Sequence, residues 1–275
     1  MDGRKGIECY ERFKRGLNGA RVSAYFPNGA PAAYALSDRA AQDKIPLVTL
    51  AYGRTEATDG RVFPYIFPVM VTFYSEASAV VNYIAEKEGG MDKLKGKKIA
   101  TVYHDSAYGR ETLDPLALFA EKYGFENIQI PVPDPGSEQS SQWRQVREQK
   151  PDWVFLRTWG VSTPVAIKTA QRFGFPADRI IGDVWASSEE DVIPAGDAAK
   201  GYLALTPYPA GADFEIHKRL KQHIIDTGKS DLRDTKAFGS VYYNSGLVDA
   251  LISVEIVRQA QAKFGNRPIT GEEGQ

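Results

Sequence analysis

The feature that most constrains the fold is a regular alternation of apolar runs and helical segments along the middle of the chain. Helical patterns over 109–123, 139–149 and 162–173 separate the first four of five apolar runs. The runs begin near residues 98, 128, 152, 179 and 202, with the sequences KIATVYH, IQIPV, DWVFLRTW, RIIGDVW and YLALTPY. Strands joined by one helix each predict a parallel sheet with helices on both faces.

The rest of the chain repeats this alternation less regularly, which favours a second sheet. The predicted elements are a helix at 6–17, a strand at 20–26, a helix at about 30–43, a strand at 45–50, an irregular edge or crossover at 62–69, a helix ending at Gly89, and late helices at 213–226 and about 238–264. The prediction is an α/β protein of two lobes, each a doubly wound, mostly parallel sheet flanked by helices. The first lobe would comprise 1–96 plus 208–275, and the second 97–207.

Composition narrows the class of partner. A net charge of −1 argues against binding to nucleic acid or to a membrane surface, which normally requires a basic excess. No apolar run reaches the roughly 18 residues of a membrane span, so we expect a soluble chain without a signal peptide of its own. Cys9 is the only cysteine and is predicted to be a buried structural thiol.

The sequence contains no recognisable catalytic, cofactor or metal motif. Phosphate-binding, dinucleotide-binding and nucleophile-elbow patterns are absent, and His217 and His223 have the wrong spacing for a metal pair on one helical face. His104 beside Asp105 at a strand end leaves open an α/β enzyme with an acid–base pair, such as a hydrolase. Hydrogen bonding within the loop is the simpler interpretation.

Several stretches together resemble the leucine/isoleucine/valine-binding proteins, the receptors of branched-chain amino-acid ABC transporters. They are HDSAYGRETL, KIPLVTLAYGRTEATDG and IPAGDAAKGYLALTPY, in the family's order over nearly the whole chain. The resemblance implies a two-lobed periplasmic protein that catalyses nothing, holds a small carboxylate between its lobes and docks on a membrane permease. Against that family the chain lacks segments at both ends, and an export signal would lie outside it.

Ligands of open parallel sheets lie at the carboxyl ends of the strands, near free main-chain donors. In the first lobe we therefore expect a ligand carboxylate near Phe26 and Asn28, and near Ala51, Gly53 and Arg54. The family resemblance implies hydroxyls and backbone amides there. Arg54 is an additional cation that would bind a carboxylate with two hydrogen bonds, or else point into solvent.

The resemblance places aromatic residues over the ligand in the second lobe, at Tyr108 and Trp159. The family's ammonium-binding glutamate falls on Val184, which leaves Asp183 as the adjacent substitute. Without it, Val184 and Trp185 would form an apolar wall suited to an acid that carries no amine. Tyr242 or Tyr243, with Tyr243 preferred, is expected to close the pocket.

Two rival functions remain open. The first is a ligand-sensing regulatory domain of the same fold, which is an alternative to the transport role. In the transport role, the ligand is either an amino acid or an aromatic acid. The enzyme hypothesis depends on His104 and Asp105 alone.

Overall fold

The structure is a computed structural model that describes residues 3–16, 22–27, 29–232 and 235–275. The chain divides into two compact units that each combine distant segments. The first unit comprises Met1–Ala79, Ser106–Leu116 and Val248–Gln275, and the second Val80–Asp105 and Ala117–Leu247. The predicted lobe boundaries, 1–96 plus 208–275 and 97–207, remain a prediction.

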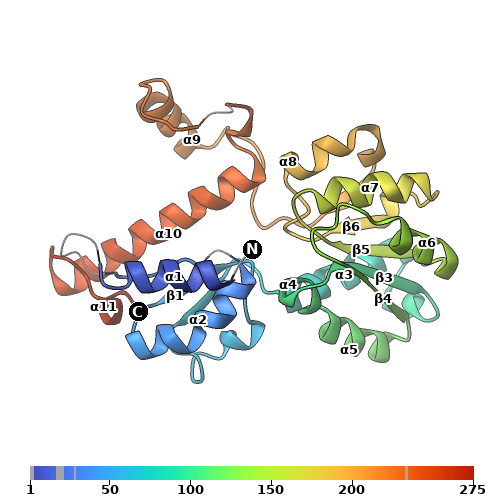
Figure 1. The fold of residues 1–275 in the computed structure, drawn as a ribbon, viewed down its shortest axis with the longest axis horizontal. Helices are drawn as coiled ribbons and strands as arrows, with labels where there is room; N and C mark the ends of the chain where they lie inside the picture. Colours follow the sequence, from blue (N-terminus) through green and yellow to red (C-terminus); the bar gives the residue numbers. More distant parts are fainter. Residues whose placement is uncertain (1–2, 17–21, 28, 233–234) are drawn as a thin grey trace. The chain divides into compact units, whose positions relative to one another are not determined.

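The second unit is built on a five-stranded sheet in which every pairing is parallel (Figure 1). Its strands are β3 (Lys98–His104), β4 (Glu126–Val132), β5 (Trp153–Arg157), β6 (Ile180–Gly182) and β7 (Leu203–Ala204), in the order β4-β3-β5-β6-β7. All five predicted apolar runs thus form strands of one sheet. The parallel α/β fold predicted from their alternation is confirmed.

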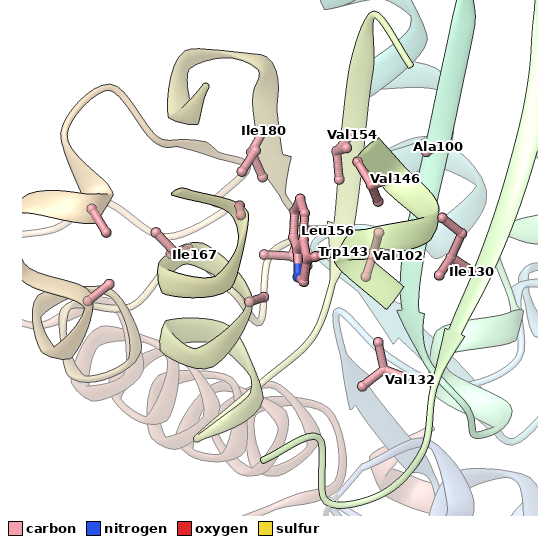
Figure 2. Packing of buried hydrophobic residues seen from close by; sticks show 14 residues of the cluster. Ala100, Val102, Ile130, Val132, Trp143, Val146, Val154, Leu156, Ile167 and Ile180 are labelled. Carbon is pink, nitrogen blue, oxygen red and sulfur yellow. The ribbon is translucent and has the colours of Figure 1, made fainter. Parts of the chain in front are cut away.

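Helices α6 (Ser140–Gln149) and α7 (Ser162–Arg172) cover one face of this sheet. Trp143 of α6 and Ile167 of α7 pack on Val102 and Leu156, and all four side chains are at most 1% exposed (Figure 2). On the other face lies α3 (Phe73–Glu88), whose Tyr83 ring meets the Trp153 ring edge-on, with the centroids 6.2 Å apart. Burial of alternate strand residues on both faces explains the nearly continuous apolar runs.

Two helix ends follow the same pattern, as predicted. The chain takes the left-handed conformation at Gly124, after α5 (Leu113–Tyr123), and at Gly174, after α7, with φ values of 76° and 79°. A residue without Cβ adopts that conformation at little cost. An aromatic residue follows each glycine. Phe125 is buried, and Phe175 packs against the hydrophobic core of the second unit.

The first unit has a smaller sheet in its described part. Strands β1 (Leu47–Leu50) and β2 (Ile66–Val69) pair in parallel, so the segment predicted to be irregular forms an edge strand. The strand predicted at 20–26 begins outside the described residues, and in its described part only Tyr25 forms a bridge, to Leu47.

Helices α1 (Gly3–Phe13) and α2 (Ala30–Asp43) bury Tyr10 and Leu36 in the core of the first unit. The prediction that Cys9 is buried is wrong: its thiol is exposed. The helix turns the adjacent Tyr10 inward instead, because one position along a helix rotates a side chain by about 100°. The helix ends at Phe13, short of the predicted residue 17.

The remaining helices are α4 (Ala107–Arg110), α8 (Glu189–Val192), α9 (Glu215–Leu220), α10 (Val241–Phe264) and α11 (Gly271–Gly274). The predicted helix over 213–226 is α9 followed by a π-helical turn, Lys221–Ile225. The predicted helix over 238–264 is α10.

Candidate functional site

The strand order of the second unit creates a switch point between β3 and β5. From β3 the chain passes to β4 on one side and then to β5 on the other. Parallel sheets of this order bind ligands at the carboxyl ends of the strands that flank such a point. His104 ends β3 and Trp159 follows β5, and their ring centroids lie 6.1 Å apart.

His104 is held in place by an acid other than its sequence neighbour. Its Nε2 atom lies 3.0 Å from Oδ1 of Asp134, and its ring is 6% exposed, whereas Asp105 is exposed. Its Nδ1 atom is buried and has no hydrogen-bond partner among the described residues. The imidazole therefore sits beneath the surface of the edge, beside Trp159.

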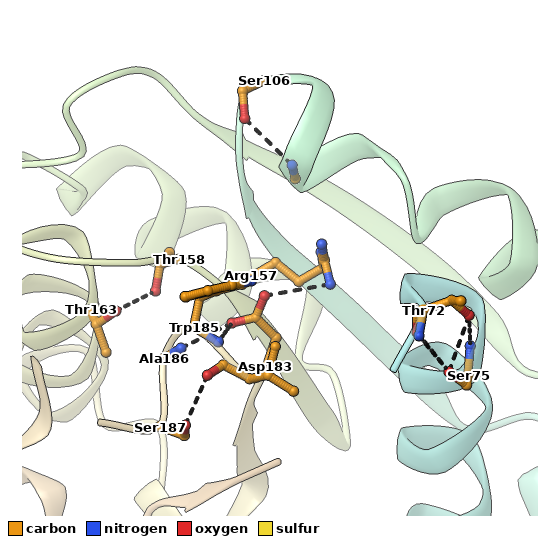
Figure 3. A network of polar contacts seen from close by, with 12 residues as sticks. Thr72, Ser75, Ser106, Arg157, Thr158, Thr163, Asp183, Trp185, Ala186 and Ser187 are labelled. Atoms are coloured by element: carbon orange, nitrogen blue, oxygen red, sulfur yellow. Dashed lines mark hydrogen bonds and ion pairs between the residues drawn. The ribbon is translucent and has the colours of Figure 1, made fainter. Parts of the chain in front are cut away.

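A buried ion pair lies at the carboxyl ends of β5 and β6 (Figure 3). Nη1 of Arg157 lies 3.4 Å from Oδ2 of Asp183, and both side chains are fully buried. Oδ1 of Asp183 also accepts hydrogen bonds from the main-chain N–H groups of Trp185 and Ala186, at 3.1 and 3.0 Å. The charge of this carboxylate is thus balanced within the protein.

The predicted wall residues follow directly. Val184 is 4% exposed, and Trp185 is partly exposed with its ring centroid 6.1 Å from that of Tyr242. The structure brings Tyr242 to Trp185. Tyr243, the predicted residue, packs against Phe238 and His217, with ring centroids 5.0 and 6.1 Å away.

Asp191, in α8, is a residue that the sequence reasoning missed. Its Oδ2 atom accepts hydrogen bonds from Gly160 N and Tyr242 Oη, each at 2.7 Å. Burial raises the pKa of this carboxyl, and the two hydrogen bonds oppose that rise. Asp191 lies in the run EED, where any of three acids looks equally exposed, so only the folded contacts distinguish it.

At the corresponding edge of the first unit, the loop after β1 adopts an unusual backbone. Ala51 and Gly53 have φ values of 53° and 94°. A Cβ atom on Gly53 would lie 3.3 Å from that of Ala33, so this position favours glycine on both counts. Of the other two predicted residues, Phe26 is partly exposed and Asn28 lies outside the described residues.

Arg54 lies against two rings at the end of this loop. Its guanidinium carbon is 5.6 Å from the ring centroid of Tyr34 and 5.0 Å from that of Phe63. Its Nε atom is buried, and it has no hydrogen-bond partner in the described part of the chain. A guanidinium in contact with aromatic rings keeps its full charge, and it is the group of this loop that can pair with a carboxylate.

Tyr108 groups with the first unit, although it was predicted in the second lobe. Its ring is 8% exposed and meets Phe73 edge-on at 5.6 Å between centroids. Glu111 in the same segment accepts hydrogen bonds from Tyr34 Oη at 3.0 Å and from Thr55 N at 2.8 Å. These hydrogen bonds hold the segment that carries Tyr108 next to Thr55, the neighbour of Arg54 in the chain.

A cavity of about 520 Å³ lies elsewhere in the first unit, between α10 and the segment of α11. Its lining includes Ile256, Ala260 and Gly274, and none of the predicted site residues. Its glutamates, Glu255, Glu272 and Glu273, are each paired with a basic side chain, so we give more weight to the carboxyl edges of the sheets.

No helix within residues 3–16, 22–27, 29–232 and 235–275 combines the length and the apolar character needed to cross a membrane. A parallel α/β sheet with rings and main-chain donors at its carboxyl edge defines a class of small-molecule-binding proteins. The chain belongs to the periplasmic binding protein family, whose sequence profile matches residues 8–262. The resemblance inferred from the sequence motifs is confirmed at the level of the family.

Solved structures give the same fold. A protein from the Pseudomonas fluorescens group, described as an ABC transporter permease, is 79% identical with a TM-score of 0.90, over 99% of this chain and 66% of that one. A Thermus thermophilus branched-chain amino-acid ABC transporter protein with bound valine is 22% identical, with a TM-score of 0.80, over 98% of this chain and 66% of that one. A solute-binding protein from Rhodopseudomonas palustris in complex with benzoate is 17% identical, with a TM-score of 0.74, over 99% and 70%.

This chain thus spans just under two thirds of the length of the first two structures, 66% of each. Among curated proteins, none matches the sequence.

Proposed function

We propose that the chain is the ligand-binding part of a substrate-binding protein of an ABC transporter, and that its ligand is a small carboxylate without an α-ammonium group, of the benzoate type. It would act in the periplasm, deliver the ligand to a membrane permease and catalyse no reaction. Family membership supports the binding role. Related structures hold valine in one case and benzoate in another, so the fold accommodates either kind of acid.

The observation that carries the choice of ligand is the pairing of Asp183 with Arg157. An α-ammonium group needs a counter-ion when it leaves water, and an unpaired buried charge costs several kcal/mol. Asp183 is fully buried and already engaged by a guanidinium and two main-chain amides. Val184 beside it offers only apolar surface.

Arg54 supports the other half of the proposal. A carboxylate requires a donor or a cation, and Arg54 supplies a guanidinium that forms no ion pair with the described carboxylates. A bidentate contact with a carboxylate is the geometry that this group favours.

Thermal unfolding with a panel of four compounds tests this assignment. Benzoate and 3,4-dihydroxybenzoate should raise the melting temperature, because a ligand that binds only the folded state stabilises it by RT ln(1 + [L]/Kd). Benzylamine, which keeps the ring and replaces the acid with an amine, should have no effect. L-valine should bind at least tenfold more weakly than benzoate by calorimetry. Tight binding of L-valine together with no binding of benzoate would contradict the proposed ligand class.

A further inference from the structure

Three partly buried aromatic residues of the second unit lie on separate segments of the chain. Hydrogen bonds of the Asp191 carboxylate link these segments. Trp159 follows β5, Trp185 follows β6 and Tyr242 belongs to the first turn of α10. Asp191 binds the N–H of Gly160, next to Trp159, and the phenol of Tyr242. That phenol also lies 2.7 Å from the main-chain oxygen of Trp185.

Asp191 is suited to this role by its burial and its geometry. Asp191 is 7% exposed, and both of its contacts, at 2.7 Å, lie within the range for hydrogen bonds to a carboxylate. The neighbouring acids of α8 do something different: Glu189 accepts from Val241 N and Glu190 from Ser240 Oγ, which caps the start of α10.

The number of hydrogens at Tyr242 links this arrangement to protonation. A phenol carries one hydrogen, yet two acceptor oxygens, Trp185 O and Asp191 Oδ2, lie 2.7 Å from it. If Asp191 is ionised, the two acceptors compete for that hydrogen. If Asp191 is protonated, its own hydrogen bonds Tyr242 Oη, and the phenol hydrogen is then given wholly to Trp185 O.

We propose that Asp191 is a positioning residue of the binding edge: it fixes Trp159, Trp185 and Tyr242 in one arrangement in which they receive a planar, ring-containing ligand. The ligand class in this inference rests on the proposed function. The geometry comes from contacts within the second unit alone. Asp191 itself touches no ligand. Its effect on binding passes through Gly160 and Tyr242.

Two substitutions of Asp191 separate the hydrogen bonds from the charge. In Asp191→Asn the amide oxygen still accepts from Gly160 N and Tyr242 Oη, as the ionised carboxylate does, but the group no longer titrates. In Asp191→Ala both contacts are lost. Asp197→Ala is the matched control, since Asp197 follows in the same segment and its side chain is 88% exposed.

The first readout needs no ligand. Amide hydrogen exchange of the peptide covering 158–162 should speed up in Asp191→Ala and stay at the parent rate in Asp191→Asn and Asp197→Ala. Tyr242→Phe keeps the Gly160 contact, so exchange there should stay slow while the tryptophan fluorescence changes around Trp185. Parent-like exchange at 158–162 in Asp191→Ala would overturn the inference.

The second readout is affinity, with benzoate and L-valine as the probes. Asp191→Ala should weaken whichever probe binds the parent by about tenfold, the equivalent of one lost hydrogen bond, with Asp191→Asn close to the parent. Unchanged affinity in Asp191→Ala, despite faster exchange, would reduce Asp191 to a structural residue and overturn the positioning role. If the parent binds neither probe, the proposed ligand class has failed, and the exchange measurement alone decides whether Asp191 fixes the edge.

The third readout is the pH profile of tryptophan fluorescence. The parent should show an inflection above the ordinary aspartate value of 3.8, because burial raises the pKa of Asp191. Among the described residues, the groups that interact with this carboxyl are Tyr242, Gly160, Glu190 and the buried Tyr202. Asp191→Asn should lack the inflection and Asp197→Ala should keep it. An inflection that persists in Asp191→Asn would assign the titration to another group and contradict the proton count at Tyr242.

Discussion

At the scale of single residues, Arg54 gives the most direct test of how an acid is held. Its guanidinium lies against the rings of Tyr34 and Phe63 and forms no ion pair with the described carboxylates. A hydrogen bond to a charged group contributes about 1.5–3 kcal/mol, so Arg54→Gln should weaken benzoate binding by about 10- to 100-fold. Isothermal titration calorimetry measures this loss.

Arg61 provides the control for Arg54. It lies in the same stretch of chain, but its side chain is 89% exposed and pairs with Asp59 at 2.8 Å. Exposed pairs of this kind contribute little, so Arg61→Gln should bind benzoate as the parent does. Equal losses in Arg54→Gln and Arg61→Gln would point to a general effect of positive charge and remove Arg54 from the site.

Asp183 carries a residue-scale prediction about stability. Asp183→Ala leaves the guanidinium of Arg157 fully buried without its carboxylate. Breaking a buried pair in this way costs about 3–5 kcal/mol, which denaturant unfolding should detect. Asp197→Ala, which removes an exposed acid, should stay within about 0.5 kcal/mol of the parent. A small loss in Asp183→Ala would mean that Arg157 finds another partner.

At the scale of elements, Glu88 joins the end of α3 to the sheet of the second unit. Its carboxylate pairs with Lys97 Nζ at 2.6 Å and accepts from Trp153 Nε1 at 2.9 Å and Arg179 Nη1 at 2.7 Å. The hydrogen bond from Lys97, followed by that from Trp153, lowers the pKa of Glu88 from 4.5 to about 2. The Glu88 side chain is only 12% exposed, whereas those of Lys97 and Arg179 are 31% and 44% exposed, so the carboxylate is the shielded member of this network.

The pH dependence of this network has a definite sign. Because the pKa is lower in the folded state, the stabilisation is fully present above pH 4.5 and is lost as the pH falls toward 2. Glu88→Gln should therefore lower the free energy of unfolding at pH 7 by about 1–3 kcal/mol and flatten its decline between pH 4.5 and 2. Urea unfolding at a series of pH values measures both effects.

Glu255 is an informative control for Glu88. Arg258 likewise lowers the pKa of Glu255 to about 2, but this pair lies on an exposed face of α10. Glu255→Gln should change the free energy of unfolding little, both at pH 7 and between pH 4.5 and 2, since solvent screens exposed pairs. If both substitutions act alike, burial is not what gives the Glu88 network its value.

The elements of the fold were largely predictable, whereas the polar contacts of the edge were not. Alternating apolar runs and Gly124 or Gly174 endings report local backbone preference, so β3 to β7 and their helices could be read from the sequence. Burial of Asp183 depends on Arg157, 26 positions earlier in the chain, and the role of Asp191 depends on Tyr242, 51 positions later. Side-chain partners so far apart leave no local pattern.

At the scale of the whole molecule, the tryptophans are distributed unevenly. All four, Trp143, Trp153, Trp159 and Trp185, belong to the second unit. Their fluorescence therefore reports the unfolding of that unit, whereas circular dichroism reports the helices of both. The described part of the first unit has a sheet of two strands against five in the second.

This asymmetry leads to a prediction about cooperativity. A two-stranded sheet is marginal without further packing, so the first unit should unfold at lower denaturant concentration than the second. The dichroism curve should then begin to fall before the fluorescence changes, since coincident curves are the signature of a single cooperative transition. Urea titrations followed by both signals on one sample measure the separation.

One variant in each unit makes the assignment specific. Leu36→Ala creates a cavity at a residue that is 0% exposed in the first unit, which costs about 2–5 kcal/mol and should shift only the early, dichroism-detected step. Asp183→Ala lies in the second unit and should shift only the later step, which both signals detect. If either substitution shifts the early and the late step together, the chain unfolds in one cooperative transition, which would contradict the prediction.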